Sequence, residues 1–508
     1  MERLGKWWFA LPPLGFLCVA SLIPVVSLLM EGRAAASMAL LLDPSTQWRL
    51  GWSAAQALAT CLVVLLLGVP LSWFVARHAF AGRSLLLRLM MLPFVMPTLV
   101  AGVGILTLFG SGGILGCELD ESAWLLLYGN VFYNLPLVLR AGVEGFSRVP
   151  DSHVSAARVL GAGRVSVFFR IEWPQACPWF LSALCMVFLY CFSGFGIALL
   201  LGGYRYATVE VEIYRMVAYE LNLGDAAVLA AVSMGFAAVV ALLHGMLERR
   251  LARPLAGHAL ALRPVTGWQA ITLAVCCLSL LMVFLFAPLA AIVWRAAASG
   301  AWHIWLEEET RVALLNTLRF TALTLIGVTT IGLCHAFASR HPVMRAMAWL
   351  PVVVSPVCVA FGLLVVYPGW SASLALLLSG YVLLAYPFVA RSVANSLDSL
   401  PDSWLAASRT LGRGTFSTLW FVVLPLVAPA LRRGLAFAAA TAVGEFAVTL
   451  FLSRPEWMTL TTLIYQRLGR AGQSNIDAAS CLSGGLLIFA LLAFVLIEWP
   501  DHRKENRA

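Results

Sequence analysis

Charge is scarce in this chain. Charged residues make up 12% of its 508 positions, and lysine occurs only as Lys6 and Lys504, so arginine supplies nearly all of the net charge of +9. Hydrophobic residues make up 61%, and the mean hydropathy is +0.88. A soluble globular protein of this composition could not cover its core with polar surface. The composition therefore predicts a polytopic membrane protein and argues against a nucleic-acid-binding one.

The scarcity of lysine also bears on the energy source. A P-loop needs a lysine directly after a Gly-x-x-x-x-Gly run to hold the phosphates of ATP, and neither lysine follows such a run. We therefore expect that the chain is not an enzyme and has no ATPase site of its own. The chain should depend on a separate ATPase or on an ion gradient.

Cysteine and histidine form no motif here. The 11 cysteines lie mostly within apolar runs and include no Cys-x-x-Cys pair, and the eight histidines lack the spacing of metal ligands. We therefore expect no disulfide framework, no metal site and no cofactor.

Long apolar runs recur along the chain. A spanning helix needs about 20 apolar residues. By that measure the sequence predicts an all-α membrane protein with about 12 transmembrane helices. The expected spans are 9–30, 53–76, 86–110, 123–140, 178–201, 226–246, 269–294, 313–338, 346–368, 373–390, 434–452 and 481–497.

A polar, basic stretch between apolar runs occurs twice. Residues 150–174 align with residues 401–425 without a gap, at an offset of 251. An internal repeat of this kind shows a duplicated unit. The identical pairs include Pro150 and Pro401, Asp151 and Asp402, Ala156 and Ala407, Arg158 and Arg409, Leu160 and Leu411, Gly161 and Gly412, and Pro174 and Pro425.

The duplication extends beyond this loop. At the same offset Pro136 matches Pro387, and Tyr214 matches Tyr465, while the LPFVMP and LPVVVSP segments match at a slightly larger offset. The chain is thus expected to hold two tandem six-helix domains with pseudo-symmetry about the membrane normal. We place them at 1–250, with a loop at 147–175, and at 268–508, with a loop at 395–426, joined by a cytoplasmic linker at 251–267.

Each repeated loop reads as a short helix with a glycine stop. Asp151 or Asp402 can cap the start, and Gly161 or Gly412 suits a left-handed terminus. Small residues between them would let another backbone approach closely. A single copy could equally be a plain re-entrant loop, but two matching copies favour a docking surface.

Arginine is distributed unevenly between the two sides of this topology. The side with the repeated loops, both chain ends and the linker holds most of the basic residues, whereas the opposite side holds acidic clusters at 118–121 and 307–309. Cytoplasmic loops are enriched in arginine and lysine. We therefore expect a multi-pass protein of the cell's cytoplasmic (inner) membrane, embedded in the lipid bilayer, with the repeated loops and both termini cytoplasmic.

Glu445 is an ionisable residue inside a predicted span. It matches Gly194 of the first half, and Phe195 and Phe446 match each other. Ionisable residues inside spans often mark a transport path. Glu445 could contact a cationic substrate, with Phe195 and Phe446 as an aromatic gate in the translocation pathway, or it could be a structural hydrogen-bonding group.

Two further segments, 207–222 and 459–472, have apolar residues at helical spacing. We expect both to form amphipathic helices lying on the outer surface. They could receive a partner protein or simply lie at the membrane interface.

The repeated loop resembles the loop of binding-protein-dependent ABC importer permeases, whose pattern is Glu-Ala-Ala, three residues and Gly. Ala156, Ala157 and Gly161 match it in the first copy, and Ala407 and Gly412 in the second. The glutamate is absent, because Ser155 and Ala406 stand there. The resemblance implies docking to two copies of an ATP-binding subunit through these residues, with Arg158 and Arg409 as the charged contacts, and delivery of the solute by an extracytoplasmic binding protein.

Within that family the chain resembles the fused permeases of thiamine importers and, next, those of ferric-iron importers. RIEWP at 170–174, LLLGGYRYATVEVEIY at 199–214, and GEF at 444–446 followed by TLTTLIYQ at 459–466 favour thiamine. The resemblance implies alternating access driven by ATP. A secondary transporter with parallel repeats, and a membrane scaffold that moves nothing, are the alternatives of other classes.

Overall fold

The computed structural model describes residues 7–34, 38–80, 82–90, 92–251, 262–265, 268–339, 341–348, 350–371, 373–452 and 454–498. These residues are nearly all helical, as predicted. In the first half the elements are η1 (Trp7–Phe9), α1 (Leu11–Leu17), η2 (Cys18–Leu22), α2 (Ile23–Ala34), α3 (Met38–Leu42), α4 (Pro44–Arg77), α5 (Arg83–Leu89), α6 (Leu92–Val95), α7 (Thr98–Phe109), α8 (Ala123–Ser147), α9 (Asp151–Val159), α10 (Arg164–Val167), η3 (Phe168–Glu172), α11 (Trp173–Phe192), α12 (Gly196–Leu201), α13 (Val209–Ala218) and α14 (Leu223–Leu251).

The second half repeats this order. Its elements are α15 (Trp268–Ala298), η4 (Ala301–Leu306), α16 (Glu308–Ala338), α17 (Pro342–Met347), α18 (Leu350–Val353), α19 (Pro356–Val366), η5 (Pro368–Trp370), α20 (Leu374–Asp398), α21 (Asp402–Thr410), α22 (Thr415–Thr418), η6 (Leu419–Val423), α23 (Leu424–Val443), α24 (Ala447–Leu452), η7 (Pro455–Trp457), α25 (Leu460–Leu468) and α26 (Gln473–Glu498).

The all-α membrane fold is confirmed. Nine helices among the described residues are long and apolar enough to cross a membrane. The predicted span at 123–140 is the continuous helix α8. The predicted spans at 86–110 and 346–368 are each broken into three helices. The second break in each span falls at Pro97 or Pro356, which lacks the N–H that a continuous helix would need.

Two other predicted spans are interrupted near their ends. The span at 178–201 stops with α11 at Phe192, and the span at 434–452 stops with α23 at Val443. Three non-helical residues follow in each half before the short helices α12 and α24 begin. Glu445 therefore lies at a break between helices and not inside a span, which corrects the sequence-based placement.

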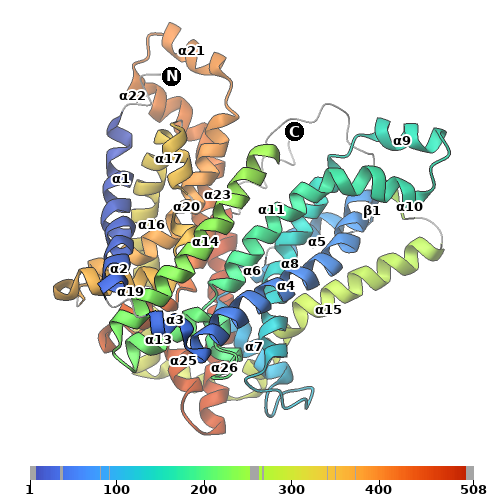
Figure 1. Ribbon diagram of the computed structural model, residues 1–508. Coiled ribbons are helices and arrows are strands. Elements are labelled where there is room, and N and C mark those ends of the chain that lie inside the picture. The colour runs from blue at the N-terminus through green and yellow to red at the C-terminus, as the bar shows by residue number, and fades with distance from the viewer. Residues whose placement is uncertain are drawn as a thin grey trace.

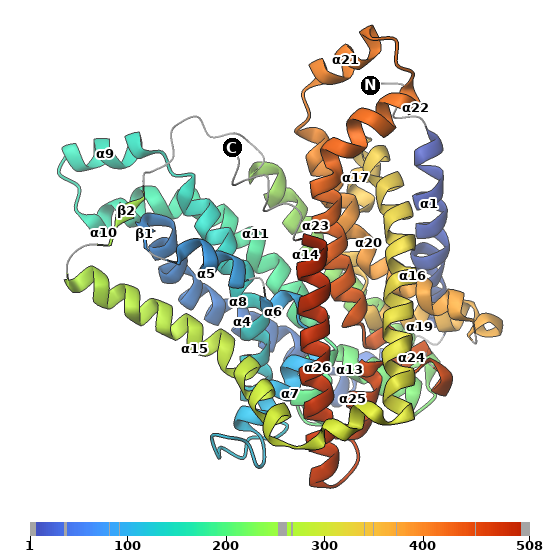
Figure 2. The same cartoon turned by 180° about the vertical axis from the view of Figure 1, so that it is seen from behind.

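The first helix of each half packs against the other half. Figures 1 and 2 show α1 and α2 beside α16, α19 and α20, while α15 runs beside α7 and the rest of the first half. The Tyr367 hydroxyl donates to the carbonyl of Val19 at 3.0 Å, and the Tyr128 hydroxyl donates to that of Phe284 at 3.1 Å. This reciprocal exchange ties the two halves together.

Glycine permits both crossings. A Cβ at Gly104 would lie 2.6 Å from the carbonyl oxygen of Pro288, and one at Gly362 would lie 2.8 Å from Cβ of Pro24. Only a residue without a side chain lets α7 approach α15, and α19 approach α2, this closely. The matched glycines therefore set the spacing between the halves.

The predicted linker at 251–267 lies mostly outside the described residues. Its described part pairs with the first half, because β2 (Arg263–Pro264) runs parallel to β1 (His78–Ala79) at the end of α4. His78 is opposite Arg263, and Ala79 is opposite Pro264. This is the one strand pairing within the described part of the chain.

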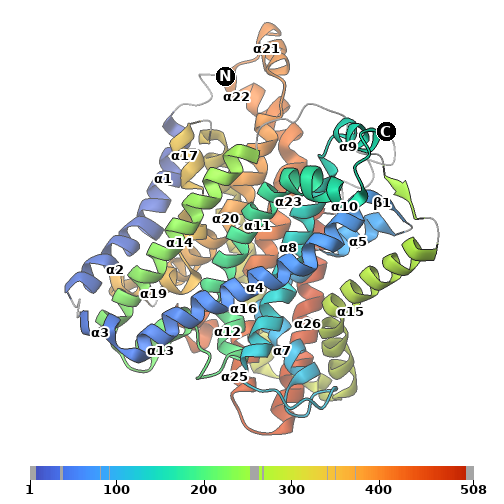
Figure 3. The same ribbon diagram turned by 45° about the vertical axis from the view of Figure 1, so that its right-hand side comes forward.

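The two halves diverge toward one end of the molecule. Figure 3 shows α9 and α21 standing apart at that end, while α13 and α25 lie at the opposite end. Helix α1 begins at the α9/α21 end, and α26 runs toward it. The repeated loops therefore face the same side, as a parallel repeat requires.

Candidate docking helices and a central cavity

Each repeated loop forms the short helix that the sequence predicts, but the predicted cap differs. In α9 the residue before the first turn is Pro150, and no side chain caps the helix. Asp151 lies inside the first turn, where its carboxylate interacts favourably with the helix dipole. The capping role predicted for Asp151 is therefore wrong, and the side chain of Asp402 lies outside the described ones.

Glycine ends both helices as predicted. Gly161 has φ of +85° and Gly412 has φ of +77°, values that a residue with a side chain adopts only under strain. The next N–H bonds back across the turn, from Ala162 to the carbonyl of Ala157 at 3.0 Å and from Arg413 to that of Ser408 at 3.2 Å. This is the bond pattern of a Schellman terminus.

Helices α9 and α21 are fixed to the underlying structure by different interactions. Under α9, Val154 packs in a small apolar cluster with Val149 and Val167, and Ala157 lies against it. Under α21, the hydroxyls of Ser408 and Thr418 form a hydrogen bond of 2.9 Å at the matching positions. Both arrangements fix a helix on top of its span.

The outward faces expose small and apolar side chains. Ala156, Arg158 and Ala407 are exposed, and the side chain of Arg409 lies outside the described ones. Leu160 is 87% exposed and Leu411 is 82% exposed. The repeat alignment already paired these leucines, yet only the structure shows that each projects beyond its helix. Exposed leucines at matched positions are typical of an interface.

A cavity of about 350 Å³ lies between the two halves. Its volume suits a small organic molecule. The polar residues of its wall come from both halves and include Thr98, Asn130, Tyr133 and Asn134 from the first, and Ser355, Thr441 and Glu445 from the second. Among the described residues of the wall, Glu445 alone carries a carboxylate.

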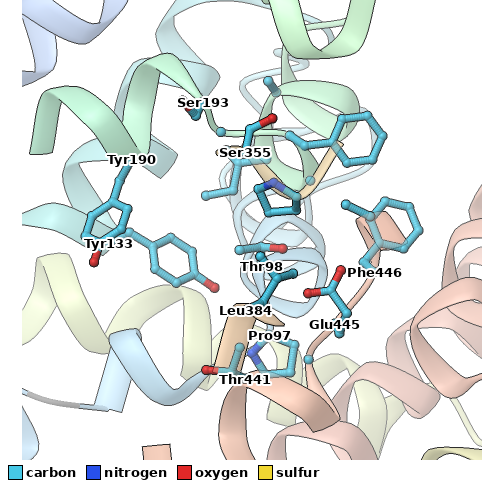
Figure 4. A pocket seen from close by; sticks show the side chains of 18 of the residues that line it. Pro97, Thr98, Tyr133, Tyr190, Ser193, Ser355, Leu384, Thr441, Glu445 and Phe446 are labelled. Atoms are coloured by element: carbon cyan, nitrogen blue, oxygen red, sulfur yellow. The ribbon is translucent and has the colours of Figure 1, made fainter. Parts of the chain in front are cut away.

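Glu445 both caps a helix and faces the cavity. Its Oε1 accepts a hydrogen bond of 2.9 Å from the N–H of Val448, in the first turn of α24. Figure 4 shows its carboxylate extending toward the space between Phe446 and the wall that carries Tyr133 and Tyr190. The side chain is largely buried, since the residue is 8% exposed. The sequence left open whether Glu445 is a structural hydrogen-bonding group or faces a pathway. In the structure its side chain caps a helix and also faces the cavity.

Phe195 and Phe446 meet on the pseudo-symmetry axis. Their rings are stacked, with centroids 5.8 Å apart and planes 23° from parallel. Tyr214 packs edge-on against Phe195 at 5.4 Å, and its counterpart Tyr465 packs against Phe446 at 5.2 Å. These four rings, the aromatic cluster, form a layer between the cavity and the α13/α25 end.

Helices α13 and α25 are present, but they are not surface helices. Val209 and Leu460 are fully buried, and their N–H groups donate to the hydroxyls of Ser53 and Thr317 at 2.8 and 3.0 Å. The predicted placement at the outer surface is therefore wrong. Apolar spacing alone cannot distinguish a helix on the interface from one inserted between spans, because both hide an apolar face.

Three amide side chains, those of Gln56, Asn130 and Asn134, support the cavity wall. They were not identified from the sequence. Asn130 donates to Gln56 at 2.6 Å, and Gln56 donates to the carbonyl of Cys191 at 2.8 Å. Asn134 lies one turn further along α8 and donates to the carbonyl of Asn130. Polar residues within predicted spans were the signal that could have found them.

The sequence pattern of the family described as "Binding-protein-dependent transport system inner membrane component" matches residues 68–253 and 340–499. Together these two matches cover more than half of the chain. The chain belongs to this family. It carries the family's domain twice, once in each half, as the internal repeat predicts.

Relatives from this family match the chain along most of its length. The thiamine transport system permease protein ThiP of Escherichia coli K12 is 24% identical over 475 residues, which are 87% of each chain. ThiP of Salmonella typhimurium LT2 is 26% identical over 529 residues, which are 95% of each chain. The molybdate/tungstate transport system permease protein WtpB of Thermococcus kodakarensis is 31% identical over 200 residues, covering 39% of this chain and 78% of WtpB.

The two functions of Glu445 can be separated by substitution. Glu445→Ala removes the acceptor for the Val448 N–H, and losing such a cap costs about 1 kcal/mol. Glu445→Gln keeps an acceptor oxygen. We expect Glu445→Ala to lower the melting temperature of the purified protein in detergent, and Glu445→Gln to leave it near the wild-type value. Equal melting temperatures for all three proteins would contradict the capping role.

Proposed function

We propose that the chain is the transmembrane permease of an ABC importer that moves thiamine into the cell. An extracytoplasmic binding protein delivers the solute, and two copies of a separate ATP-binding subunit drive transport. Membership of the binding-protein-dependent family supports the importer, and the thiamine permeases that match most of the chain support the substrate. The single observation that carries the mechanism is the pair of matched, exposed helices α9 and α21 at one end of a shared cavity.

The α9/α21 end is proposed to face the cytoplasm, with both termini on that side. Exposed arginines gather there, on and beside the two helices, at Arg148, Arg158, Arg164 and Arg413. The predominance of arginine on cytoplasmic loops supports this orientation. The opposite end, with α13 and α25, then faces the binding protein.

Docking is proposed through the outward face of each helix. Leu160 and Leu411 would enter a groove on the ATPase subunit, and Ala156 and Ala407 would allow close backbone contact. Ala157, Arg158, Arg409, Gly161 and Gly412 complete the docking set. Because the two copies share these residues except Ala157, whose counterpart is Ser408, one kind of ATPase subunit fits both.

Transport would proceed by alternating access. In the structure the Phe195 and Phe446 rings are stacked, while α9 and α21 are apart. The aromatic cluster is proposed to close the path toward the α13/α25 end in this state. ATP would draw the two ATPase subunits and their docked helices together. The halves would then rock, separate Phe195 from Phe446 and admit the solute to the cavity.

A carboxylate in the cavity wall suits a cationic cargo. Thiamine carries a fixed positive charge and two aromatic rings, so Glu445 can compensate its charge while Phe195 and Phe446 offer ring faces. A cation held near aromatic faces gains about 0.5–2 kcal/mol. The size of the cavity, about 350 Å³, is compatible with such a molecule.

The docking proposal predicts uncoupling when the glycine stops are replaced. Both positions require positive φ, so Gly161→Val with Gly412→Val should distort the two termini and displace Leu160 and Leu411. We expect ATP hydrolysis by the assembled complex to continue while thiamine uptake falls by about tenfold or more. Gly235→Val, at a helical glycine with open space around it, is the matched control.

Undiminished uptake in the double glycine variant would contradict docking through these helices. Uptake that survives removal of ATP and collapses with the proton gradient would instead identify a secondary transporter. Absence of flux under either drive would identify a scaffold.

The substrate proposal predicts that Glu445→Gln weakens thiamine import. Removing the charge leaves the helix cap but lowers the attraction for a cation, so the rate at limiting thiamine should fall several-fold while protein abundance stays constant. The measurement is uptake of labelled thiamine into proteoliposomes containing the full complex. Uptake of ferric iron in place of thiamine, or unchanged thiamine uptake in the variant, would contradict the assignment.

A further inference from the structure

A second carboxylate, Glu210, is buried outside the cavity wall. It lies in the first turn of α13 and is 0% exposed. Within the described part of the chain, no basic side chain lies within ion-pair distance of it. A buried carboxylate of this kind is stable only when its oxygens receive hydrogen bonds.

Two serines from opposite halves supply those bonds. The Ser233 hydroxyl, on α14 of the first half, donates to Oε1 of Glu210 at 2.9 Å. The Ser355 hydroxyl, at the start of α19 in the second half, donates to Oε2 at 2.6 Å. Glu210 therefore joins the halves directly at the level of the aromatic cluster.

Ser355 is also part of the cavity wall. Its Oγ accepts the N–H of Cys358 at 3.1 Å and so caps α19, while its one proton is used in the bond to Glu210. The hydroxyl has a single proton, and that proton is donated to Glu210. The orientation of the hydroxyl therefore depends on Glu210. The bond thus connects the end of α19 to α13.

Helix α13 also connects Glu210 to the aromatic cluster. Tyr214 lies one turn beyond Glu210 on the same face and packs against Phe195. It also packs edge-on against Phe451 of the second half, with centroids 5.2 Å apart. A movement that separates α13 from α19 would therefore withdraw Tyr214 from Phe451, the ring that belongs to the second half.

Among its described residues, the second half has no equivalent bond between the halves. The position that matches Glu210 is Thr461, whose hydroxyl donates to the carbonyl of Glu445 in its own half at 2.9 Å. The two buried glutamates thus occupy different positions: Glu445 faces the cavity, and Glu210 joins the halves. The rings of the aromatic cluster thus follow the pseudo-symmetry, whereas the hydrogen bond between Glu210 and Ser355 has no counterpart among the described residues.

We propose that Glu210 is a positioning residue that holds the outer gate closed through its hydrogen bond to Ser355, and that this bond breaks when the permease opens outward. The inference rests on the proposed function, in which Phe195 and Phe446 form the outer gate. It assigns a role in the transport cycle to Glu210, which lies outside the cavity wall, and to Ser355 through its bond to Glu210.

The test measures gate closure directly in the full complex. Spin labels are placed at Ala218 on α13 and Gln466 on α25, both exposed, in a background without other reactive cysteines but with Cys358 retained. Electron–electron resonance then gives the distribution of label separations in nanodiscs, with and without ATP. In the otherwise unmodified protein we expect one short separation without nucleotide and a longer one with ATP.

Loss of the bond should shift this distribution without nucleotide. We expect Glu210→Ala and Ser355→Ala each to raise the population with the long separation by roughly tenfold, the size of effect for a hydrogen bond to a charged group. The double variant should rise by clearly less than the two single effects combined, because both changes remove the same bond between the halves. Glu210→Gln, which keeps an acceptor for Ser355, should restore the closed distribution.

Ser480→Ala is the matched control. It removes a buried serine hydroxyl of the second half whose hydrogen bond, to the carbonyl of Ile476, lies within α26, so the long separation should stay as rare as in the unmodified protein. An equal rise in this control would show a general loosening and overturn the inference. So would a closed distribution in both Glu210→Ala and Ser355→Ala, or additive effects in the double variant.

The same measurement distinguishes a failure of the proposed alternating access from a failure of the proposed hydrogen-bond role. If ATP fails to lengthen the separation in the unmodified protein, the proposed alternating access is wrong. If ATP lengthens it but the Glu210 and Ser355 variants match the unmodified protein, only the role of the hydrogen bond is wrong.

Discussion

The fold depends on satisfying polar backbone groups where two spans are broken. Inside a bilayer a carbonyl or N–H group without a partner costs several kcal/mol, so non-helical backbone is stable only where the protein itself supplies hydrogen bonds or water reaches it. At the break after α11 the Thr208 hydroxyl donates to the carbonyl of Gly194 at 3.4 Å, and at the break after α23 the Thr461 hydroxyl donates to that of Glu445 at 2.9 Å. Both donors come from the segments that begin α13 and α25.

This requirement explains why the aromatic cluster and the cavity lie where they do. The inserted helices α13 and α25 satisfy the breaks, and they bring Tyr214 and Tyr465 against Phe195 and Phe446. The breaks in turn direct helix ends and the Glu445 carboxylate toward the space between the halves. A polar cavity can form there because backbone groups at the breaks are no longer hydrogen-bonded within a continuous helix.

Much of this architecture could be predicted from the sequence. The 251-residue repeat predicted two like-oriented halves, the glycine stops at Gly161 and Gly412 predicted the ends of α9 and α21, and the matching of Phe195 with Phe446 identified two rings that the structure stacks. These features are local or follow from symmetry. Hydrophobicity also located the spans, because it reports composition over about 20 residues.

Other features depend on contacts between distant segments. The burial of α13 and α25 was missed because an apolar helical stripe does not reveal what covers it. Glu210 was missed because its surroundings are assembled from α14 and α19, and nothing next to it in the sequence indicates Ser355. The exchange of α1 and α15 between the halves rests on the approach of Gly104 to Pro288 and of Gly362 to Pro24, which no single segment encodes.

The central claim is that two matched helices transmit the movement of a separate ATPase to a gate at the opposite end of the molecule. The most direct measurement is the distance between spin labels at Ser155 on α9 and Ala406 on α21 in the complete complex, with and without ATP trapped on the ATPase subunits. The account predicts that ATP shortens this distance by several ångströms or more as the outer gate opens. A distance that stays the same, or that lengthens when ATP binds, would contradict it.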